Sequence, residues 1–343
     1  MKTFPSVTTA RRDFALTSAI AIALAAALSI VAPTSVRADE YPSKPIIVKV
    51  AYAVGGPADA AMRQLQGPLQ AALGQPVIIE NVPGASGTLG AMATLKQPAD
   101  GYTILVSTGS DAILGPLAIA TAKYKASELR LIYPLIVSEF VLVSAAKYSF
   151  NGLDDLVVQA KARPAGQLPY SFGTWGPGSV PQLVLADFKA QTGMEAVEVP
   201  YRGGAPIVQD LMGGQLDMAF APLAGNMQSV IEGGKVKAVS MITPARNPNL
   251  PNVPAANESA RLKNFNYTVW PGVFVDARMP EPVVAKLHKA VATIVNGPEY
   301  RKWSAATGNQ TLKPMTLAET GAYYDNERAR LERLAASTNL VPQ

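Results

Sequence analysis

Short apolar runs alternate with segments of helical spacing along most of the chain. The run PIIVKVAYA at 45–53 is broken by Val54–Pro57, and apolar residues at helical spacing follow from Asp59. Two further units of this kind follow, with strands expected at 77–80 and 102–107, a helix at 89–96, and polar loops at 81–87 and 108–111. This alternation predicts an α/β fold with a mostly parallel sheet covered by helices on both faces.

The second half of the chain repeats the pattern. A long apolar stretch at 131–143 is suited to cross from one sheet to another. Beyond it we expect helices at 153–162, 180–189 and 207–212, and strands at 168–172, 196–200, 218–220 and 236–241. Two amphipathic helices, 281–296 and 317–337, are expected to pack on the first lobe. We therefore predict a first lobe of residues 39–140 and 245–343 and a second lobe of residues 141–244.

Residues 1–38 have the composition of a targeting segment. Basic residues at Lys2, Arg11 and Arg12 precede an uncharged apolar run at 15–32, and small residues lead to an expected cleavage after Ala38. The Arg11-Arg12 pair resembles a twin-arginine signal, so both the Sec and the Tat route remain open. The alternative is a membrane anchor, because a run of 18 apolar residues is just long enough to span a bilayer.

The amino-acid composition excludes several kinds of binding partner and reaction. The formal net charge of +5 falls to +2 once the four basic and one acidic residues of 1–38 are removed, and no Lys/Arg cluster then favours nucleic acid or an anionic membrane. The absence of cysteine excludes disulfides, thiol chemistry and zinc–thiolate sites. With His288 as the one histidine, expected to pack on a helix, we predict no catalytic residues, no metal and no cofactor.

The glycine-bearing loops offer backbone N–H groups. Glycine lets the main chain approach a ligand closely, and helix N-termini present unpaired N–H groups to an anion. A carboxylate suits such loops better than a cation does. The alternative is that the glycines serve only as turns. The spacing of Gly84, Gly87 and Gly90 does not match a dinucleotide or phosphate loop.

Several motifs together give the chain a family resemblance. They are Gly55-Gly56 with Asp59, Asn81–Gly87 (NVPGASG), Asp100–Thr103 (DGYT) and Val199–Pro206 (VPYRGGAP), and the resemblance runs from Tyr41 to the C-terminus. The chain resembles the substrate-binding proteins of tripartite tricarboxylate transporters, the Bug family of periplasmic receptors.

The resemblance implies a two-lobed, periplasmic-binding-protein-like clamshell of type II. It implies a monomer in the periplasm that captures a small organic carboxylate between its lobes and delivers it to membrane permease subunits, with no nucleic acid as partner. A ligand-presenting sensory receptor of the same fold, acting on a signalling partner, is the alternative function. The gene neighbourhood, permease or sensor kinase, would separate the two.

The expected ligand-binding residues lie in the loops of both lobes. They are Tyr52, Gly55, Gly56, Asp59, Ser86, Gly87, Thr88, Thr108, Gly109, Ser110, Thr174, Trp175, Gly178, Ser179, Tyr201, Arg202, Gly203 and Ala205.

Departures from the usual family pattern bear on the ligand. Val54 stands where the family usually has proline, and Pro57 and Ala58 stand where it usually has small polar residues, so the first loop loses a likely hydroxyl. Gln182 and Ala221 replace a common histidine and aspartate. Loss of that aspartate favours a plain mono- or dicarboxylate over an amino acid.

We therefore expect selectivity to lie mainly with Trp175, Ser179 and Arg202. Arg202 either clamps a second carboxylate or points to solvent. Asp59 either braces its loop as a cap or contacts the ligand.

Overall fold

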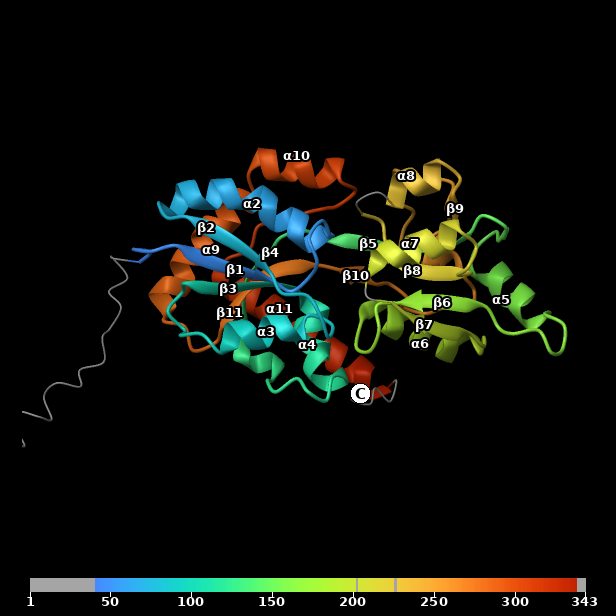
Figure 1. The fold of residues 1–343 in the computed structure, drawn as a ribbon. Helices are drawn as coiled ribbons and strands as arrows, with labels where there is room; N and C mark the ends of the chain where they lie inside the picture. Colours follow the sequence, from blue (N-terminus) through green and yellow to red (C-terminus); the bar gives the residue numbers. More distant parts are fainter. Residues whose placement is uncertain (1–40, 202, 225–226, 338–343) are drawn as a thin grey trace, which may run out of the picture. The chain divides into compact units, whose positions relative to one another are not determined.

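Two β-sheets flanked by helices organise the chain (Figure 1). The computed structural model describes residues 41–201, 203–224 and 227–337. The first sheet has the order β2-β1-β3-β11-β4 and consists of β1 (Ile46–Val50), β2 (Val77–Asn81), β3 (Thr103–Thr108), β4 (Leu129–Pro134) and β11 (Pro271–Asp276). The second has the order β10-β5-β8-β6-β7, with β9 also pairing β5, and consists of β5 (Ser138–Ala145), β6 (Ser171–Thr174), β7 (Val197–Pro200), β8 (Met218–Pro222), β9 (Val236–Met241) and β10 (Thr268–Val269).

Each sheet is parallel except for one strand. β11 runs antiparallel to β3 and β4, and β5 runs antiparallel to β8, β9 and β10. These two strands are the ones with which the chain enters a sheet after leaving the other. The apolar stretch 131–143 is thus divided between β4 and β5, and the predicted mostly parallel, two-sheet α/β fold is confirmed.

Helices cover the first sheet. They are α2 (Pro57–Leu73), α3 (Thr88–Leu95), α4 (Gly109–Ala118), the short 3-10 turn η1 (Ala126–Glu128), α9 (Glu281–Val295), α10 (Pro298–Ala306) and α11 (Leu317–Ser337). In Figure 1, α2 and α10 lie on one side of the sheet, and α3, α4 and α11 lie on the other. Both α9 and α11 contact β4, so the prediction that the C-terminal helices pack on this sheet is confirmed.

One predicted loop is wrong. Residues 108–111 do not form a loop, because Thr108 is the N-cap of α4 and the next three residues form its first turn. The Thr108 hydroxyl oxygen accepts from the backbone N–H of Asp111 at 3.1 Å, which is the side-chain bond that typically starts a helix. The polar residues that suggested a loop are therefore the capping residues of a helix.

Both faces of the second sheet are buried. Its helices are α5 (Leu153–Lys161), α6 (Val180–Thr192), α7 (Gly204–Met212) and α8 (Met227–Glu232), with the 3-10 turn η2 (Ala256–Glu258). Along β5, Phe140 and Leu142 pack with α5 and α6, whereas Val141 and Val143 pack with α7 and α8. This alternation is the period of two expected of a strand with two covered faces.

Residues between 256 and 269 also belong to the core of the second sheet, including Phe265 and Tyr267. Residues 245–343 were predicted to belong to the first lobe, whereas the 256–269 segment packs on the second sheet. The exact lobe limits remain a prediction.

Trp270 occupies the point where the chain passes from β10 back to β11. Its carbonyl accepts from the N–H of Gly109 at 3.0 Å, and its indole N–H donates to Glu327 of α11 at 3.3 Å. A Cβ on Gly109 would lie only 1.9 Å from the Trp270 ring. Glycine is therefore required at the start of α4, because any side chain there would occupy the space of the indole.

Helix α11 connects the cores of the two sheets. Leu331 packs in the core of the first sheet, and Leu334 packs against the cores of both. From the second sheet, Leu183 of α6 reaches into the first core. Among the described residues no helix combines the length and apolar character required to cross a membrane. The predicted signal segment, residues 1–38, lies outside them.

The Gly109 contact can be tested with a matched pair of glycine substitutions. Gly109→Ala places a methyl group on the Trp270 ring and should lower the free energy of unfolding by about 2 kcal/mol or more, because overpacking a filled core costs about 1–3 kcal/mol. Gly67→Ala, inside α2 with no atom near the new methyl, should instead raise it by about 0.5–1 kcal/mol. Urea unfolding measures both, and equal midpoints for Gly109→Ala and wild type would contradict the packing argument.

Candidate functional site

The predicted binding residues lie where parallel strands end and helices begin. In the first sheet β1, β2 and β3 lead into α2, α3 and α4, and in the second sheet β6 and β7 lead into α6 and α7. The two groups of loops touch, because the Ser86 hydroxyl donates to the carbonyl of Pro177 at 2.8 Å. Loops at the carboxyl ends of parallel strands are the usual ligand sites of α/β sheets.

Asp59 braces the first loop. Its carboxylate accepts from Gly55 N–H at 2.9 Å, Arg63 Nε at 2.8 Å and Asn81 Nδ2 at 2.9 Å, and the residue is 1% exposed. Burial alone would raise its pKa, but the hydrogen bonds from Arg63, Gly55 and Asn81 outweigh burial and lower the pKa. Both carboxylate oxygens are thus bonded within the loop, as the bracing interpretation requires.

Asn81 was missed by the sequence analysis. Its side-chain N–H groups donate to Asp59 and to the carbonyl of Tyr52, each at 2.9 Å, so it joins the end of β2 to the loop after β1. In the sequence, Asn81 is recognisable only as a polar residue at the end of an apolar strand. That position does not show which neighbouring residue its side chain contacts.

Tyr52 is the centre of a hydroxyl network. Its OH lies 2.7 Å from Asp111 Oδ2 and 3.1 Å from the Thr108 hydroxyl, and it accepts from Thr108 N–H at 2.9 Å. The Ser110 hydroxyl lies 3.1 Å from that of Thr108. Burial, followed by the negative charge of Asp111, raises the pKa of Tyr52 well above its ordinary value, so it acts as a neutral hydrogen-bonding group.

The 84–88 turn has an unusual backbone. Ala85 and Ser86 have φ of 46° and 47°, in the left-handed region that side chains disfavour, and Gly87 follows at 75°. The turn is closed by Gly87 N–H donating to Gly84 at 3.1 Å and by the buried Thr88 hydroxyl donating to Ala85 at 2.7 Å. This conformation directs the Ser86 hydroxyl to Pro177 in the loop after β6.

The loop after β6 packs tightly against α4. A Cβ on Gly178 would lie 2.4 Å from the Ala118 side chain, so only glycine fits. Gly178 N–H donates to Gln182 at 2.8 Å, and the buried Ser179 hydroxyl donates to Gly176 at 2.7 Å. The hydroxyl of Ser179 is therefore engaged inside its own loop.

Trp175 and Thr174 are partly committed to packing and internal bonds. Trp175 is half-buried, packs against both cores of the second sheet and lies 6.2 Å from Phe140 between ring centroids. The buried Thr174 hydroxyl donates to Glu198 at 2.8 Å. The indole faces the start of α7, since its Nε1 is 3.8 Å from a Cβ placed on Gly204.

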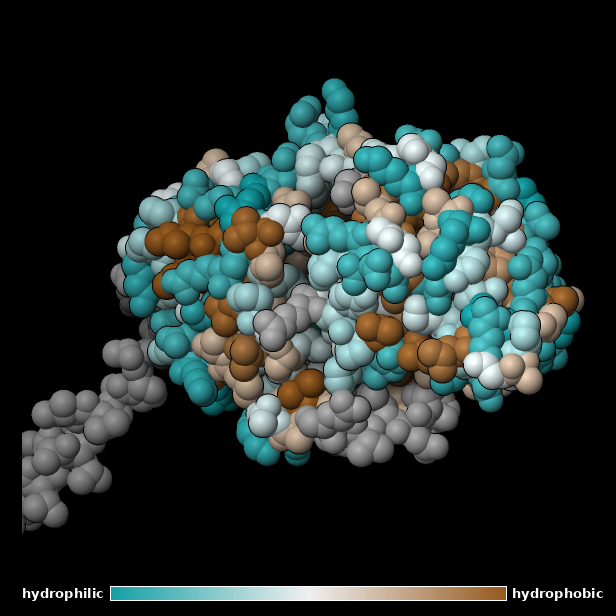
Figure 2. Space-filling view, turned by 45° about the vertical axis from the view of Figure 1, so that its right-hand side comes forward, coloured by the Kyte–Doolittle hydropathy of each residue, from teal (hydrophilic) through white to brown (hydrophobic). Residues whose placement is uncertain are grey.

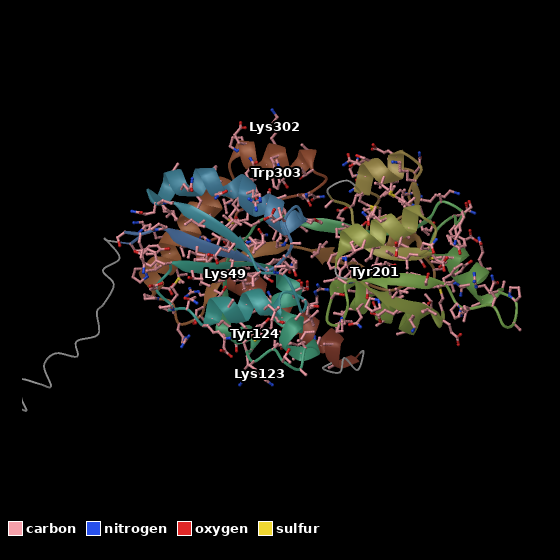
Figure 3. The ribbon with its side chains drawn as sticks, viewed as in Figure 1. Lys49, Lys123, Tyr124, Tyr201, Lys302 and Trp303 are labelled. Atoms are coloured by element: carbon pink, nitrogen blue, oxygen red, sulfur yellow. The ribbon has the colours of Figure 1, made fainter. Side chains whose placement is uncertain are left out.

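The remaining predicted residues surround the start of α7. Tyr201, labelled in Figure 3, donates its hydroxyl to Asp210 at 2.6 Å, and burial together with Asp210 raises its pKa to about 12. Gly203 is the N-cap of α7 with φ of 140°, and Ala205 is exposed in the first turn. Arg202 lies outside the described residues.

Many of the predicted backbone donors already have acceptors within the protein. The N–H groups of Gly55, Gly87, Thr88, Thr108, Gly109, Gly178 and Ser179 donate to neighbouring loop or strand atoms. Across residues 41–201, 203–224 and 227–337, the N–H groups without an acceptor in these loops include those of Gly56, Ser86, Ser110, Gly203, Gly204 and Ala205. These groups, from both sheets, are what the loops can offer an anion.

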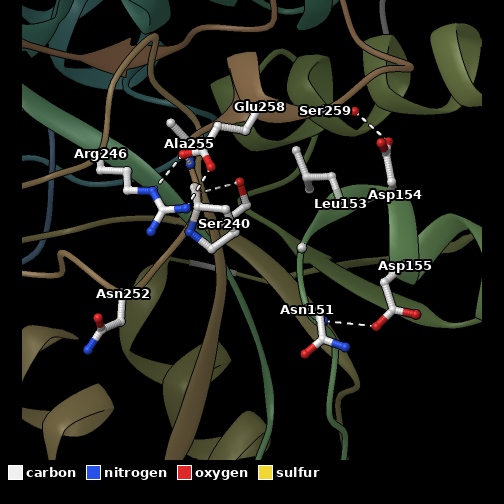
Figure 4. Close-up of a pocket in the computed structure, with 12 residues that line it drawn as sticks. Asn151, Leu153, Asp154, Asp155, Ser240, Arg246, Asn252, Ala255, Glu258 and Ser259 are labelled. Carbon is white, nitrogen blue, oxygen red and sulfur yellow. Dashed lines mark hydrogen bonds and ion pairs between the residues drawn. The ribbon is translucent and has the colours of Figure 1, made fainter.

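A separate pocket of about 310 Å³ lies on the second sheet (Figure 4). Its charged groups are paired with protein atoms. Arg246 binds both oxygens of Glu258 at 2.7 and 2.6 Å, and Asp154 accepts from the Ser259 hydroxyl at 2.6 Å. Within the described part of the chain, no group of three or more His, Asp or Glu side chains is arranged to hold a metal ion.

Exposed apolar side chains lie in separate places. Val54 and Leu89 follow β1 and β2, whereas Leu168 and Val197 lie beside β6 and in β7. The face drawn in Figure 2 shows several hydrophobic patches interrupted by hydrophilic residues.

Comparison with known proteins adds sequence and structural relatives. Protein BugT of Bordetella pertussis is 35% identical over 252 residues, covering 71% of this chain and 73% of its own. A protein from the tcbD–tcbE intergenic region of Pseudomonas sp. (strain P51) is 30% identical over 310 residues, covering 89% of both chains.

Solved structures agree with the fold. The periplasmic binding protein BugD superposes with a TM-score of 0.77 at 26% identity, covering 88% of this chain and 100% of its own. MatC from Rhodopseudomonas palustris, solved with bound malate, has a TM-score of 0.76 at 25% identity and covers 86% of this chain and 99% of its own. These are two-lobed α/β binding proteins, as the sequence analysis predicted for this chain.

The family itself is established by a sequence profile. Residues 61–340 match the profile described as tripartite tricarboxylate transporter family receptor, also known as TctC. The match covers most of the chain, including every strand except β1 and every helix apart from the first residues of α2. The chain belongs to the TctC family of tripartite tricarboxylate transporter receptors.

Proposed function

We propose that this chain is an exported, periplasmic solute-binding protein that captures a small organic carboxylate for a tripartite tricarboxylate-type uptake system. The ligand carboxylate is held mainly by backbone N–H groups at the carboxyl edges of the two sheets. The loaded protein, a monomer, then docks on the permease subunits in the membrane. Members of this family are solute-binding proteins rather than enzymes, and we assign no catalytic step to this chain.

One observation carries the proposal. The loops of the two sheets meet at the Ser86–Pro177 hydrogen bond, and unpaired N–H groups remain on both sides of that contact, at Ser86 and Ser110 on the first sheet and at Gly203 on the second. Helix N-termini carry partial positive charge and attract anions. An anion bound there would touch both sheets at once, which is how a two-lobed receptor couples binding to closure.

The relatives support a carboxylate as the ligand class. MatC, which shares this fold at 25% identity, was solved with malate bound. Asp59 braces its loop and is not a ligand contact, because its carboxylate is already bonded to Gly55, Arg63 and Asn81. Its part in binding is to fix the first loop.

The first prediction tests the ligand class. Malate, succinate and other small organic acids should raise the melting temperature of the mature protein, because a ligand selective for the folded state stabilises it by about 2.7 kcal/mol at a hundred times Kd. In a chain of this size that corresponds to a shift of about 4 °C. Thermal-shift screening followed by calorimetry measures it, with the matched amides and alcohols as controls. If no carboxylate among a broad panel shifts the melting temperature, the proposed function is wrong.

The second prediction tests the contact between the loops. Gly178→Ala should weaken ligand binding by about tenfold or more, since its new methyl group would collide with Ala118. Gly176→Ala is the matched control, because Gly176 has a similar positive φ of 89° but open space around the added methyl group. Calorimetric Kd values of the two variants should differ, and equal affinities would show that the contact has no role in binding.

The third prediction concerns Arg202, whose side chain we propose as the partner of a second carboxylate. Arg202→Ala should weaken a dicarboxylate by about tenfold to a hundredfold, because charge-assisted hydrogen bonds contribute about 1.5–3 kcal/mol. The monocarboxylate of equal carbon number serves as the internal control and should bind as before. An unchanged dissociation constant for every dicarboxylate that binds the wild-type protein would eliminate the clamp.

A further inference from the structure

Asp111 is a buried carboxyl group in the candidate site. It lies in the first turn of α4 and is 4% exposed. One oxygen, Oδ2, accepts from the Tyr52 hydroxyl at 2.7 Å, whereas Oδ1 is buried and has no hydrogen-bond partner among the described residues. A buried polar atom without a partner is costly, so its retention calls for an explanation.

A second unpartnered oxygen lies close by. The hydroxyl of Tyr124, on the segment after α4, is buried and also without a partner in the described part of the chain (Figure 3). Burial and then the charge of Asp111 raise the pKa of Tyr124. A neutral tyrosine hydroxyl can accept as well as donate.

Both groups lie against the 84–88 turn. A Cβ placed on Gly87 would be 3.5 Å from the Asp111 side chain, and one placed on Gly115 would be 3.3 Å from the Tyr124 hydroxyl and 2.6 Å from Thr88. Asp111 is also bonded to Tyr52 and, through its N–H, to Thr108, which are two of the expected ligand-binding residues. An anion held by these loops would therefore lie near a buried carboxyl group.

Among the described residues, no cationic side chain contributes to the pKa of Asp111. Burial raises its pKa to about 6, although hydrogen bonds with Tyr52 and Thr108 act in the opposite direction. Neither β3 nor α3 carries a titratable side chain. The titratable groups on the other elements around α4 are Tyr52, Asp59 and Arg63 beside β1, Lys123, Tyr124, Lys125 and Glu128 around η1, and Glu319, Tyr323, Tyr324, Asp325, Glu327, Arg328, Arg330, Glu332 and Arg333 on α11.

We propose that Asp111 takes up one proton from solvent when a carboxylate binds at the 84–88 turn and the start of α4. The inference rests on the proposed function. Two carboxylates close together in a buried site cannot both remain ionised without a large cost, and the protein carboxyl group is the one whose surroundings already favour the neutral form. The proton is placed on Oδ1, the oxygen that has no hydrogen-bond partner among the described residues.

The pH dependence has a definite sign. A bound anion raises the affinity of Asp111 for its proton, so the complex holds more protons than the free protein between the two pKa values. For a ligand that stays ionised, affinity no longer changes with pH once Asp111 is neutral below pH 6, and it falls by up to about tenfold per pH unit above pH 6. The affinity stops falling once the pH exceeds the pKa that Asp111 has in the complex.

Calorimetry in two buffers tests the proposal. Malate, succinate and the acid giving the largest thermal shift are titrated into the mature protein at pH 7 in phosphate and in Tris, whose ionisation enthalpies differ. A buffer-dependent enthalpy corresponding to uptake of a substantial fraction of one proton per bound acid is the expected result. Binding without proton uptake at any pH from 6 to 8 overturns the proposal and leaves the proposed function standing. No bound acid at all overturns both.

Variants and a ligand-free measurement complete the test. Asp111→Asn keeps the shape of the side chain and should bind with an affinity that no longer depends on pH and without proton uptake. Asp155→Asn is the matched control in the first turn of α5, where the carboxylate accepts from Asn151 N–H at 2.9 Å, and it should retain the wild-type proton uptake.

A carboxyl carbon NMR titration of the ligand-free wild type gives an answer even if Asp111→Asn does not fold. The resonance of Asp111 should titrate near pH 6 rather than near the value of about 4 expected for an exposed aspartate. A midpoint below about 4.5 overturns the proposal.

Discussion

The packing of Trp270 on Gly109 is the contact on which much of this structure depends. Trp270 lies where the chain returns from the second sheet to the first, and its carbonyl and ring both engage the first residue of α4. Its indole N–H reaches α11, whose Leu334 in turn packs on the cores of both sheets. Because Gly109 has no side chain, the segment around Trp270, helix α4 and helix α11 can pack together.

The same contact positions the polar groups of the site. Because Gly109 is fixed by Trp270, the cap at Thr108 and the carboxyl group of Asp111 are fixed relative to Tyr52. Many polar groups of the loops are hydrogen-bonded to one another and so fix the loop conformation, as the bonds from Gly55 and Asn81 to Asp59 show. A rigid frame of this kind lowers the ordering cost that a small ligand must overcome on binding.

The sequence was most informative where local periodicity decides the structure. The alternation of strands and helices, the crossing at 131–143 and the packing of the C-terminal helices on the first sheet follow from apolar spacing and were predicted. Strands β10 and β11 and helices α4, α8 and α10 were not predicted, and residues 108–111 were expected to form a loop rather than the cap and first turn of α4. β11 pairs with β3 and β4, which are more than a hundred residues earlier in the chain, and local patterns carry no information about such partners.

The candidate site was predictable in outline only. The glycine-bearing loops identified the edge of the sheet, and the bracing interpretation of Asp59 agrees with its three bonds. Which N–H groups remain unpaired depends on partners in three dimensions, such as Trp270 for Gly109, so that distinction was out of reach. Asp111 was visible as a polar residue in the sequence, but its burial and its unpartnered oxygen were not.

The contact between Ser86 and Pro177 makes the chain suitable for conversion into an optical sensor. The natural sequence contains no cysteine, so a thiol introduced at one of these two loops would be the single labelling position in the protein. A dye attached beside the contact would change its solvent environment whenever the two loops separate or meet. Opening and closing could then be followed as fluorescence in real time, without modifying the ligand.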